Sequence, residues 1–345
     1  MKFGILGSGS WGTALAKILT DKGHRIYWWN RSEWAIEQLK QRHHNPQYLP
    51  SAHLDISKLE LTSNPETVIK HSDVILIAIP SAFAAEVLAS LDKGCFRGKK
   101  IISAIKGILP EENVLLNDYL KQHFNFPIED YFTVLGPCHA EEVAAEKLSY
   151  LTFTGVDKAY TSLISQAFRS AYINTIENSD IYGVQYAAVL KNIYAVGSGI
   201  AHGLDYGDNF LSVLIANSAD EMAGFLRKAG ILNAEVGYLE TDKSPQTLPH
   251  HNYASSVYLG DLLVTCYSLF SRNRTFGNMI GKGYSVKAAQ LEMSMVAEGY
   301  NASKCMHIIN RKIGAGMPIA ETVYQVLWQQ LPASEGFSFI EKNLV

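Results

Sequence analysis

Three glycines near the N-terminus have the spacing of a phosphate-binding turn. Gly7, Gly9 and Gly12 form a G-x-G-x-x-G run that follows the apolar segment Lys2 to Leu6 and opens a helical pattern. In this context Gly7 permits a tight turn, Gly9 lets the backbone approach a pyrophosphate, and Gly12 lets the helix pack on the strand. The free N–H groups at the helix start would face the phosphates. The spacing predicts a dinucleotide site, with a purely structural turn as the alternative.

The residue after the second predicted strand indicates which dinucleotide is preferred. The strand-like run Arg25 to Asn30 is followed by Arg31 and Ser32, so no carboxylate stands where Asp or Glu would hold the ribose hydroxyls of NAD. The planar guanidinium of Arg31 matches the oxygens of a 2′-phosphate. We therefore expect NADPH and NADP to bind, with NADH and NAD also accepted. The alternative is a solvated arginine on a loop.

A lysine lies inside a long apolar segment. The pattern predicts a helix over Tyr182 to Ile200, and this segment contains Lys191 and Asn192. An ammonium group is seldom buried without a partner, because its desolvation costs several kcal/mol. Lys191 is therefore a candidate general acid. The alternative is a lysine at a helix end whose ammonium group reaches water.

Two further basic sites could bind an anionic ligand. Ser271, Arg272, Asn273 and Arg274 are consecutive, and a hydroxyl, a guanidinium and an amide together can surround a phosphate. The alternative for this cluster is a solvated helix end. Lys106 follows a predicted strand, at the edge where open α/β sheets bind their ligands.

The elements that must position these residues divide the chain into two parts. Nearly continuous apolar runs are typical of a parallel sheet covered on both faces. They predict an α/β Rossmann-type, doubly wound parallel sheet over residues 1–180. From residue 181 the strand signals stop and long helical patterns follow, which predicts an all-α domain over residues 181–345. The predicted strands are 2–6, 25–30, 74–79, 101–105, 132–135, 150–154 and 172–176. Besides the helix after Gly12, which ends at Gly23, the predicted helices are 82–91, 111–124, 182–200, 210–228, 257–270, 285–299 and 303–312.

Composition excludes several other classes of protein. A chain of 345 residues with 47% hydrophobic residues is long enough for two domains, each with its own core. A net charge of −3 argues against nucleic acid as a partner. The N-terminus lacks the features of a cleaved signal, and no apolar run has the roughly 18 residues of a membrane span. We expect a soluble cytoplasmic protein.

No metal site is expected. The four cysteines are too far apart for a C-x-x-C pair, so we expect reduced thiols. The polar stretch Glu240 to Asn252 contains the adjacent His250 and His251, but two neighbouring histidines without a third ligand at a fixed spacing rarely bind metal. An exposed loop is the expected structure of this stretch.

Taken together, these residues resemble a known enzyme family. The segments GSGSWGTA, NRS, AIKGI, GPCHAEEVA, LKNIYAVGSGIAHGLDYGDN, GDLLVTC, SRNRTFG and VAEG follow one another along nearly the whole chain. Their order is similar to that of the bacterial-type NAD(P)-dependent glycerol-3-phosphate dehydrogenases. The resemblance implies reversible reduction of dihydroxyacetone phosphate to sn-glycerol 3-phosphate, which supplies phospholipid synthesis. It also implies a homodimer and a helical substrate-binding domain over residues 181–345, like the C-terminal domain of 6-phosphogluconate dehydrogenase.

The resemblance further implies roles for particular residues. Lys191 would act as general acid and base, Asp261 would keep it charged and oriented, and Lys106 would add a second positive charge near the reacting oxygen. The implied dinucleotide contacts beyond the glycines are Ser10, Trp11, Arg31, Tyr48, Lys106, Ala140, Arg272, Val296 and Glu298. The implied substrate contacts are Lys106, Gly136, Cys138, Lys191, Asp261, Ser271, Arg272 and Asn273.

The chain departs from the family pattern at Cys138 and His139. The family usually has Ser, Thr or Asn after Gly-Pro and then a bulky aromatic residue, so one substrate contact becomes a thiol or a backbone N–H. The stretch 240–252 is an insertion relative to the family. Two other functions stay open: a related Rossmann dehydrogenase of a β-hydroxyacid or sugar acid, and a redox-sensing dinucleotide-binding protein without catalysis.

Overall fold

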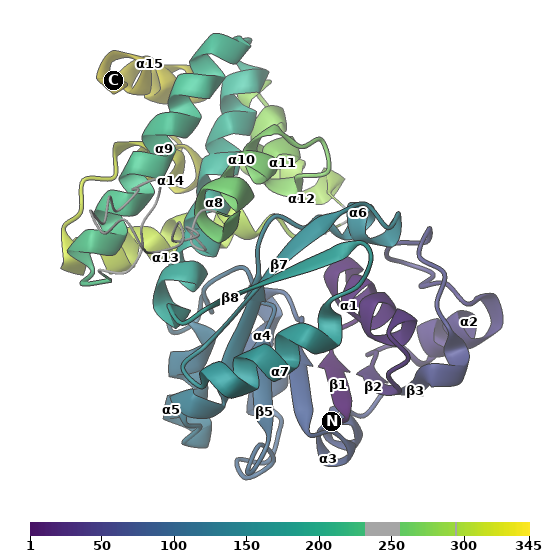
Figure 1. Cartoon of the computed structure of the whole chain (residues 1–345). Coiled ribbons are helices and arrows are strands. Elements are labelled where there is room, and N and C mark those ends of the chain that lie inside the picture. The colour runs from purple at the N-terminus through teal and green to yellow at the C-terminus, as the bar shows by residue number, and fades with distance from the viewer. Residues whose placement is uncertain (232–255, 294) are drawn as a thin grey trace, which may run out of the picture. The chain divides into compact units, whose positions relative to one another are not determined.

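The computed structural model describes residues 1–231, 256–293 and 295–345 (Figure 1). Its contacts divide the chain into two compact units, Met1–Ile181 and Tyr182–Val345. The predicted loop over residues 240–252 lies outside the described residues.

The first unit is built on one sheet with the strand order β3-β2-β1-β4-β5-β6-β7-β8. The strands are β1 Phe3–Leu6, β2 Ile26–Trp29, β3 Leu59–Thr62, β4 Val74–Ile77, β5 Lys100–Ser103, β6 Tyr131–Leu135, β7 Ser149–Gly155 and β8 Ile173–Asn178. The order reverses between β1 and β4, which are parallel neighbours. Ligands of open α/β sheets bind outside the carboxyl ends of the strands at such a reversal. The predicted Rossmann-type fold is confirmed.

Helices cover the two faces of this sheet. They are α1 Ser10–Asp21, α2 Glu33–Arg42, α3 Pro65–His71, α4 Ser81–Ala89, α5 Leu116–Phe124, α6 Ala140–Ala144 and α7 Lys158–Phe168, with 3₁₀ turns at Ile56–Lys58 and Ile128–Asp130. Val74 and Leu76 of β4 share a core with α1 and α7. Ile75 and Ile77 share the other core with α3, α4 and α5. Because successive side chains point to opposite faces, both of which are covered, the strand is apolar throughout.

One strand pair differs from the predicted parallel sheet. β7 pairs with β6 in the antiparallel direction, whereas its other neighbour, β8, is parallel to it. The only helix between β6 and β7 is α6, which has five residues. A helix of that length rises about 7 Å, less than half of the roughly 17 Å that a five-residue strand spans. α6 by itself does not return the chain to the opposite edge of the sheet, and β7 runs antiparallel from the edge where β6 ends.

The predicted helix over 111–124 is wrong in its first part. α5 begins only at Leu116. Before it, Leu109 forms an antiparallel bridge with Val114, and Asn113 has a φ of 58°. This tight turn uses the backbone groups that a helix would need. The predicted end of the first helix at Gly23 agrees with the structure, because α1 ends at Asp21 and Gly23 has a φ of 87°.

The described part of the second unit contains helices and no strand, which confirms the all-α prediction. The helices are α8 Ile181–Gly203, α9 Asp208–Lys228, α10 Asp261–Tyr267, α11 Arg272–Gly281, α12 Val286–Glu292, α13 Glu298–Ile313, α14 Pro318–Trp328 and α15 Ala333–Asn343. Every residue of α8 from Ala187 to Ala201 is buried. No helix in the described residues is long and apolar enough to cross a membrane.

Two predicted helices of this unit are divided differently in the structure. The segment 257–270 consists of a π-helical turn at Ser256–Gly260 and then α10. The segment 285–299 ends as a helix at Glu292, and α13 begins at Glu298 and continues through the gap that the pattern left at 300–302. The predicted helix is therefore interrupted after Glu292, and Glu298 of the VAEG segment is the first residue of α13.

Glycines bring α8 and α11 into direct backbone contact. A Cβ atom on Gly199 would meet the carbonyl oxygen of Arg274, and one on Gly277 would meet the carbonyl oxygen of Val196. A Cβ on Gly203 would in the same way meet the carbonyl oxygen of Asn278. No side chain separates the two helices along this line, which fixes the register of α11 against α8.

Candidate active site

The glycine-rich turn joins β1 to α1 at the carboxyl edge of the sheet. Gly7 has a φ of 117°, and a Cβ there would lie 2.5 Å from the carbonyl oxygen of Ala78. A Cβ on Gly12 would meet the carbonyl oxygen of Gly7, so the helix packs directly on the turn. A Cβ on Gly9 would meet nothing within 4 Å. Gly7 and Gly12 thus have the steric roles that the spacing predicts, and the backbone at Gly9 can be approached.

Two residues that sequence reasoning missed hold this turn in place. The Trp28 indole N–H donates to the carbonyl oxygen of Gly7 at 2.9 Å. The Asn45 side-chain amide donates to the Ser8 carbonyl oxygen at 2.9 Å, and its oxygen accepts the backbone N–H of Tyr48 at 3.1 Å. Asn45 therefore ties the loop that carries Tyr48 to the turn. Its place in the NPQYLP segment was the available signal, since a buried amide needs partners.

Arg31 lies exposed in the short connection between β2, which ends at Trp29, and α2, which begins at Glu33. The buried side chain of Asn30 accepts the backbone N–H of Ser32 at 3.1 Å. The Ser32 hydroxyl accepts the N–H of Ala35 at 3.2 Å and caps α2. A guanidinium group and a capped helix start are thus adjacent at the carboxyl end of β2, and both favour an anion.

Lys106, Trp11 and Cys138 come together in the first unit. The Lys106 ammonium lies 5.0 Å from the centroid of the Trp11 ring and 3.8 Å from the Cys138 sulfur. The Cys138 thiol donates to the carbonyl oxygen of Gly136 at 3.1 Å. Gly136 itself has a φ of 127°, and a Cβ there would lie 2.8 Å from the Tyr150 carbonyl oxygen. The start of α1, the end of β5 and the segment after β6 therefore meet, and Ala140 follows as the first residue of α6.

In the second unit, Lys191 and Asp261 form a buried ion pair. Their side chains are 3% and 2% exposed. Lys191 lies in the middle of α8, so the alternative of a helix-end lysine reaching water is excluded. Asp261 is the first residue of α10, where the helix dipole favours a carboxylate. Burial raises the pKa of the nearby Cys266 thiol to about 12, which leaves that thiol neutral.

The serine, arginine and asparagine of the basic cluster lie at the start of a helix, not at a solvated end. Ser271 caps α11 by accepting the N–H of Arg274 at 3.3 Å. The Asn273 side chain donates to Asn192 of α8 at 2.9 Å. Ser271 and Asn273 are buried, whereas Arg272 is exposed. The solvated-end alternative therefore fits only the arginine.

The VAEG segment contacts the same part of α8. The backbone N–H of Gly299 donates to the Asn273 side-chain oxygen at 2.9 Å. A Cβ on Gly299 would lie 2.5 Å from the carbonyl oxygen of Asn192. Val296 is half-buried just before α13, and Glu298 is its first residue. Asn192, which no sequence argument assigned to the site, is the residue to which both Asn273 and Gly299 attach.

Among the residues that the structure describes, no group of three or more His, Cys, Asp or Glu side chains could hold a metal ion. The polar centres are instead a glycine-rich turn with a neighbouring lysine in the first unit, and a lysine–aspartate pair beside an asparagine pair in the second. A Rossmann-type unit with a glycine-rich turn, followed by a helical unit that contains a buried lysine, is typical of a nicotinamide-dependent dehydrogenase.

Comparison with known proteins gives the family. The N-terminal domain of NAD-dependent glycerol-3-phosphate dehydrogenase matches residues 2–161, and its C-terminal domain matches residues 180–338. The chain belongs to this family.

Individual relatives match along the full length. The chain is 33% identical to glycerol-3-phosphate dehydrogenase [NAD(P)+] of Staphylococcus carnosus over 98% of this chain and 97% of that protein. It is 34% identical to the enzyme of the same name from Bacillus anthracis over 95% and 91% of the two chains. The crystal structure of glycerol-3-phosphate dehydrogenase from Coxiella burnetii superposes with a TM-score of 0.85 at 25% identity and covers 99% of each chain.

Proposed function

We propose that the protein catalyses the reversible, NAD(P)H-dependent reduction of dihydroxyacetone phosphate to sn-glycerol 3-phosphate. The observation that carries this proposal is the buried Lys191–Asp261 pair in a chain that belongs to the glycerol-3-phosphate dehydrogenase family over both of its domains. Family membership does not favour the two alternatives, a β-hydroxyacid or sugar-acid dehydrogenase and a non-catalytic redox sensor.

The first unit has the features that a nicotinamide dinucleotide needs. The open side of Gly9 allows a pyrophosphate to approach the backbone. The indole N–H of Trp11 is buried, and no described protein group accepts its hydrogen bond, so it can donate to a ligand. Arg31 would bind a 2′-phosphate, which supports a preference for NADPH with use of NADH. When bound, the dinucleotide supplies the hydride.

Lys191 would supply the proton. Negative charge develops on the ketone oxygen during the reduction, and a positioned ammonium group can donate a proton to that oxygen. Asp261 holds the Lys191 ammonium in place and stabilises its charge until the transfer. Lys106 would add a second positive charge near the same oxygen. In the reverse direction neutral Lys191 would accept the proton from the hydroxyl.

The start of α11 would bind the substrate phosphate. Arg272 is exposed and charged, and the helix start of α11 favours an anion, although Ser271 already accepts one N–H group of its first turn, that of Arg274. Asn273 is fixed by Asn192 and by Gly299 through hydrogen bonds of 2.9 Å each. A phosphate-bearing ketone is therefore favoured over a ketone without phosphate.

Three finer properties belong to the same proposal. The protein would act as a homodimer in the cytoplasm, and its product would supply the glycerol backbone of phospholipids. The family resemblance supports each of these properties.

The decisive assay combines the purified protein with NADPH and dihydroxyacetone phosphate and follows the loss of the reduced nicotinamide absorbance. The matched control is dihydroxyacetone, which has the same ketone but no phosphate, and a second control is a β-keto acid. We expect turnover with dihydroxyacetone phosphate and no turnover with either control compound. Turnover with the keto acid would support the related dehydrogenase, and dinucleotide binding without turnover would support the sensor.

A further inference from the structure

The short helix α6 carries part of the candidate site but cannot hold its own position. It has five residues, far below the roughly 12 that an isolated helix needs for marginal stability. Ala140 is its first residue, and Gly136 and Cys138 directly precede it. Its buried side chains, Ala140, Val143 and Ala144, pack in the same core as α1. Three small apolar side chains bury little area, so other contacts must fix α6.

The chain turns sharply where α6 ends. Glu146 has a φ of 55°, a left-handed backbone conformation that residues other than glycine rarely adopt. The backbone N–H of Glu146 donates to the Val143 carbonyl oxygen at 3.0 Å, and that of Lys147 donates to the Glu142 carbonyl oxygen at 2.9 Å. These bonds close the helix and fix the place from which the Glu146 side chain extends.

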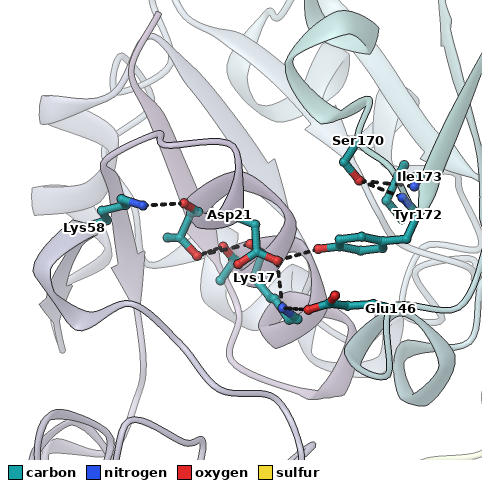
Figure 2. Close-up of polar contacts among 9 residues, drawn as sticks. Lys17, Asp21, Lys58, Glu146, Ser170, Tyr172 and Ile173 are labelled. Atoms are coloured by element: carbon teal, nitrogen blue, oxygen red, sulfur yellow. Dashed lines mark hydrogen bonds and ion pairs between the residues drawn. The ribbon is translucent and has the colours of Figure 1, made fainter.

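Lys17 of α1 receives that side chain. The Lys17 ammonium donates to a Glu146 carboxylate oxygen at 3.0 Å and to an Asp21 carboxylate oxygen at 2.7 Å (Figure 2). Lys17 is only 6% exposed. Burial alone would lower its pKa, but the hydrogen bonds and charges of the two carboxylates outweigh this effect and raise the pKa. Lys17 is therefore a charged link between the second half of α1 and the end of α6.

The same end of α1 is tied to two other segments. The Tyr172 hydroxyl donates to Asp21 at 2.6 Å, and Tyr172 stands just before β8 (Figure 2). Lys58 donates to the Thr20 carbonyl oxygen at 3.0 Å. Asp21 is thus held by Tyr172 while it holds Lys17, so the ammonium group has a fixed place from which to bind Glu146.

We propose that Lys17 is a positioning residue for dinucleotide binding: it fixes α6 on α1 and thereby sets Ala140 and the segment before it against the glycine-rich turn. Both ends of α1 then contribute to dinucleotide binding. Its first turn would face the phosphates, and its second half would hold α6 in place through Lys17 and Glu146. This inference rests on the proposed function and on the family resemblance, which implies that Ala140 contacts the dinucleotide.

A purely stabilising role is the competing explanation, and another ion pair of the same unit provides the control. Lys100 of β5 pairs with Asp130 at 2.5 Å, and its ammonium lies 4.7 Å from the centroid of the Tyr160 ring. The side chains of the Lys100–Asp130 pair are partly buried, with exposures of 25% and 28%, and the pair belongs to neither α1 nor α6. Its loss should lower stability without moving α6.

The experiment compares Lys17→Met, Lys17→Arg, Glu146→Gln and Lys100→Met in the full chain. Calorimetric titration gives the dissociation constant of NADPH without substrate, and steady-state kinetics with dihydroxyacetone phosphate give kcat. We expect Lys17→Met to raise the NADPH dissociation constant about tenfold and Glu146→Gln about threefold, with kcat at saturation within about twofold. Lys17→Arg should restore most of the affinity because a guanidinium can bind both carboxylates. Lys100→Met should bind NADPH as the original protein does.

Several outcomes would overturn the inference. Unchanged NADPH affinity in folded Lys17→Met would do so, and so would an equal loss of affinity in Lys100→Met. If Lys17→Met does not fold, Glu146→Gln decides, because Glu146 is 59% exposed and its replacement keeps the size of the side chain. A protein that binds NADPH but does not reduce dihydroxyacetone phosphate would refute the proposed reaction, and the binding data would still test Lys17.

Discussion

The ammonium group of Lys191 and the carboxylate of Asp261 form an ion pair from which water is almost completely excluded, with side-chain exposures of 3% and 2%. Each of the two charges stabilises the other in the interior. Removal of one partner from such a pair typically costs about 3–5 kcal/mol, because an uncompensated charge stays buried. The pair therefore joins α8 to α10 as well as supplying the proposed proton donor.

Lys191→Ala should lower kcat by about 10²–10⁴-fold, the usual contribution of a general acid. The dissociation constant of NADPH should change by less than about twofold, because the glycine-rich turn and Arg31 belong to the first unit. Steady-state kinetics with dihydroxyacetone phosphate measure kcat, and calorimetric titration measures the dissociation constant. Unchanged turnover would remove Lys191 from the acid role.

The double variant Lys191→Met with Asp261→Asn separates catalysis from stability. It removes both charges, so its midpoint of urea unfolding should recover much of what the single alanine variant loses. Its turnover should stay low because the proton donor is absent. Recovery of turnover in the double variant would contradict the proposed role.

Arg31→Ala should weaken NADPH about tenfold and NADH by less than about twofold, since the two dinucleotides differ only in the 2′-phosphate. Arg25→Ala is the matched control: Arg25 is also exposed but precedes β2, at the opposite end of that strand. It should change neither dissociation constant. Equal losses for NADPH and NADH in Arg31→Ala would show that the 2′-phosphate is not bound there.

Glu221 predicts a pH dependence of stability. Its carboxylate accepts the backbone N–H groups of Ile319 and Ala320 at the start of α14, at 2.8 and 2.9 Å, and the Tyr194 hydroxyl at 3.1 Å. Burial raises its pKa from 4.5 to about 7, against the lowering effect of these hydrogen bonds. Between these two pH values the unfolded chain releases a proton that the folded protein keeps. Stability should therefore fall as the pH rises through this window, by up to about 3 kcal/mol.

Urea unfolding of the original protein and of Glu221→Gln at pH 5, 6, 7 and 8 tests this point. The variant has no titrating group at position 221, so its free energy of unfolding should fall less between pH 5 and 7. Above about pH 8, where Glu221 is ionised in both the folded and the unfolded state, the two curves should run parallel. Identical slopes throughout would show that Glu221 titrates normally.

Two helical glycines should respond to alanine substitution in opposite directions, because Gly277 lies in the backbone contact between α8 and α11 and Gly224 of α9 does not. Gly277→Ala should lower the free energy of unfolding by about 1–3 kcal/mol, because the new methyl group meets the Val196 carbonyl oxygen. Gly224→Ala in α9, where a Cβ would meet nothing within 4 Å, should raise it by about 0.5–1 kcal/mol. Thermal unfolding of both variants measures the effects. A neutral Gly277→Ala would mean that the two helices can separate without cost.

The sequence was sufficient for features whose signal is local. The apolar run at Val74 to Ile79 marks β4 because both faces of the strand are covered, and the glycine spacing marks the turn after β1. Edge strand β3 was not predicted, since Leu59 to Thr62 is short, only partly buried and not continuously apolar. α6 is too short to show a helical period.

The parts of the site that could not be predicted depend on partners distant in the chain. The Asn45 side chain donates to the backbone carbonyl oxygen of Ser8, which is 37 positions earlier in the chain. The Asn273 side chain donates to the side-chain oxygen of Asn192, which is 81 positions earlier. Nothing in the local pattern around either asparagine names its partner. The pairing of Lys191 with Asp261 was likewise available only through the family resemblance, because an apolar helix shows that a lysine needs a counter-charge but not which one.

Trp28 illustrates how narrow the tolerance for substitution can be at a position that hydropathy alone would class as core. Its ring fills the interior on one face of the sheet, and its indole N–H holds the Gly7 carbonyl oxygen at 2.9 Å. A phenylalanine could pack in the same core, but it has no N–H group to donate to the Gly7 carbonyl oxygen. The hydrogen bond from the Trp28 indole N–H therefore limits which residues can replace Trp28, although its side chain is fully buried.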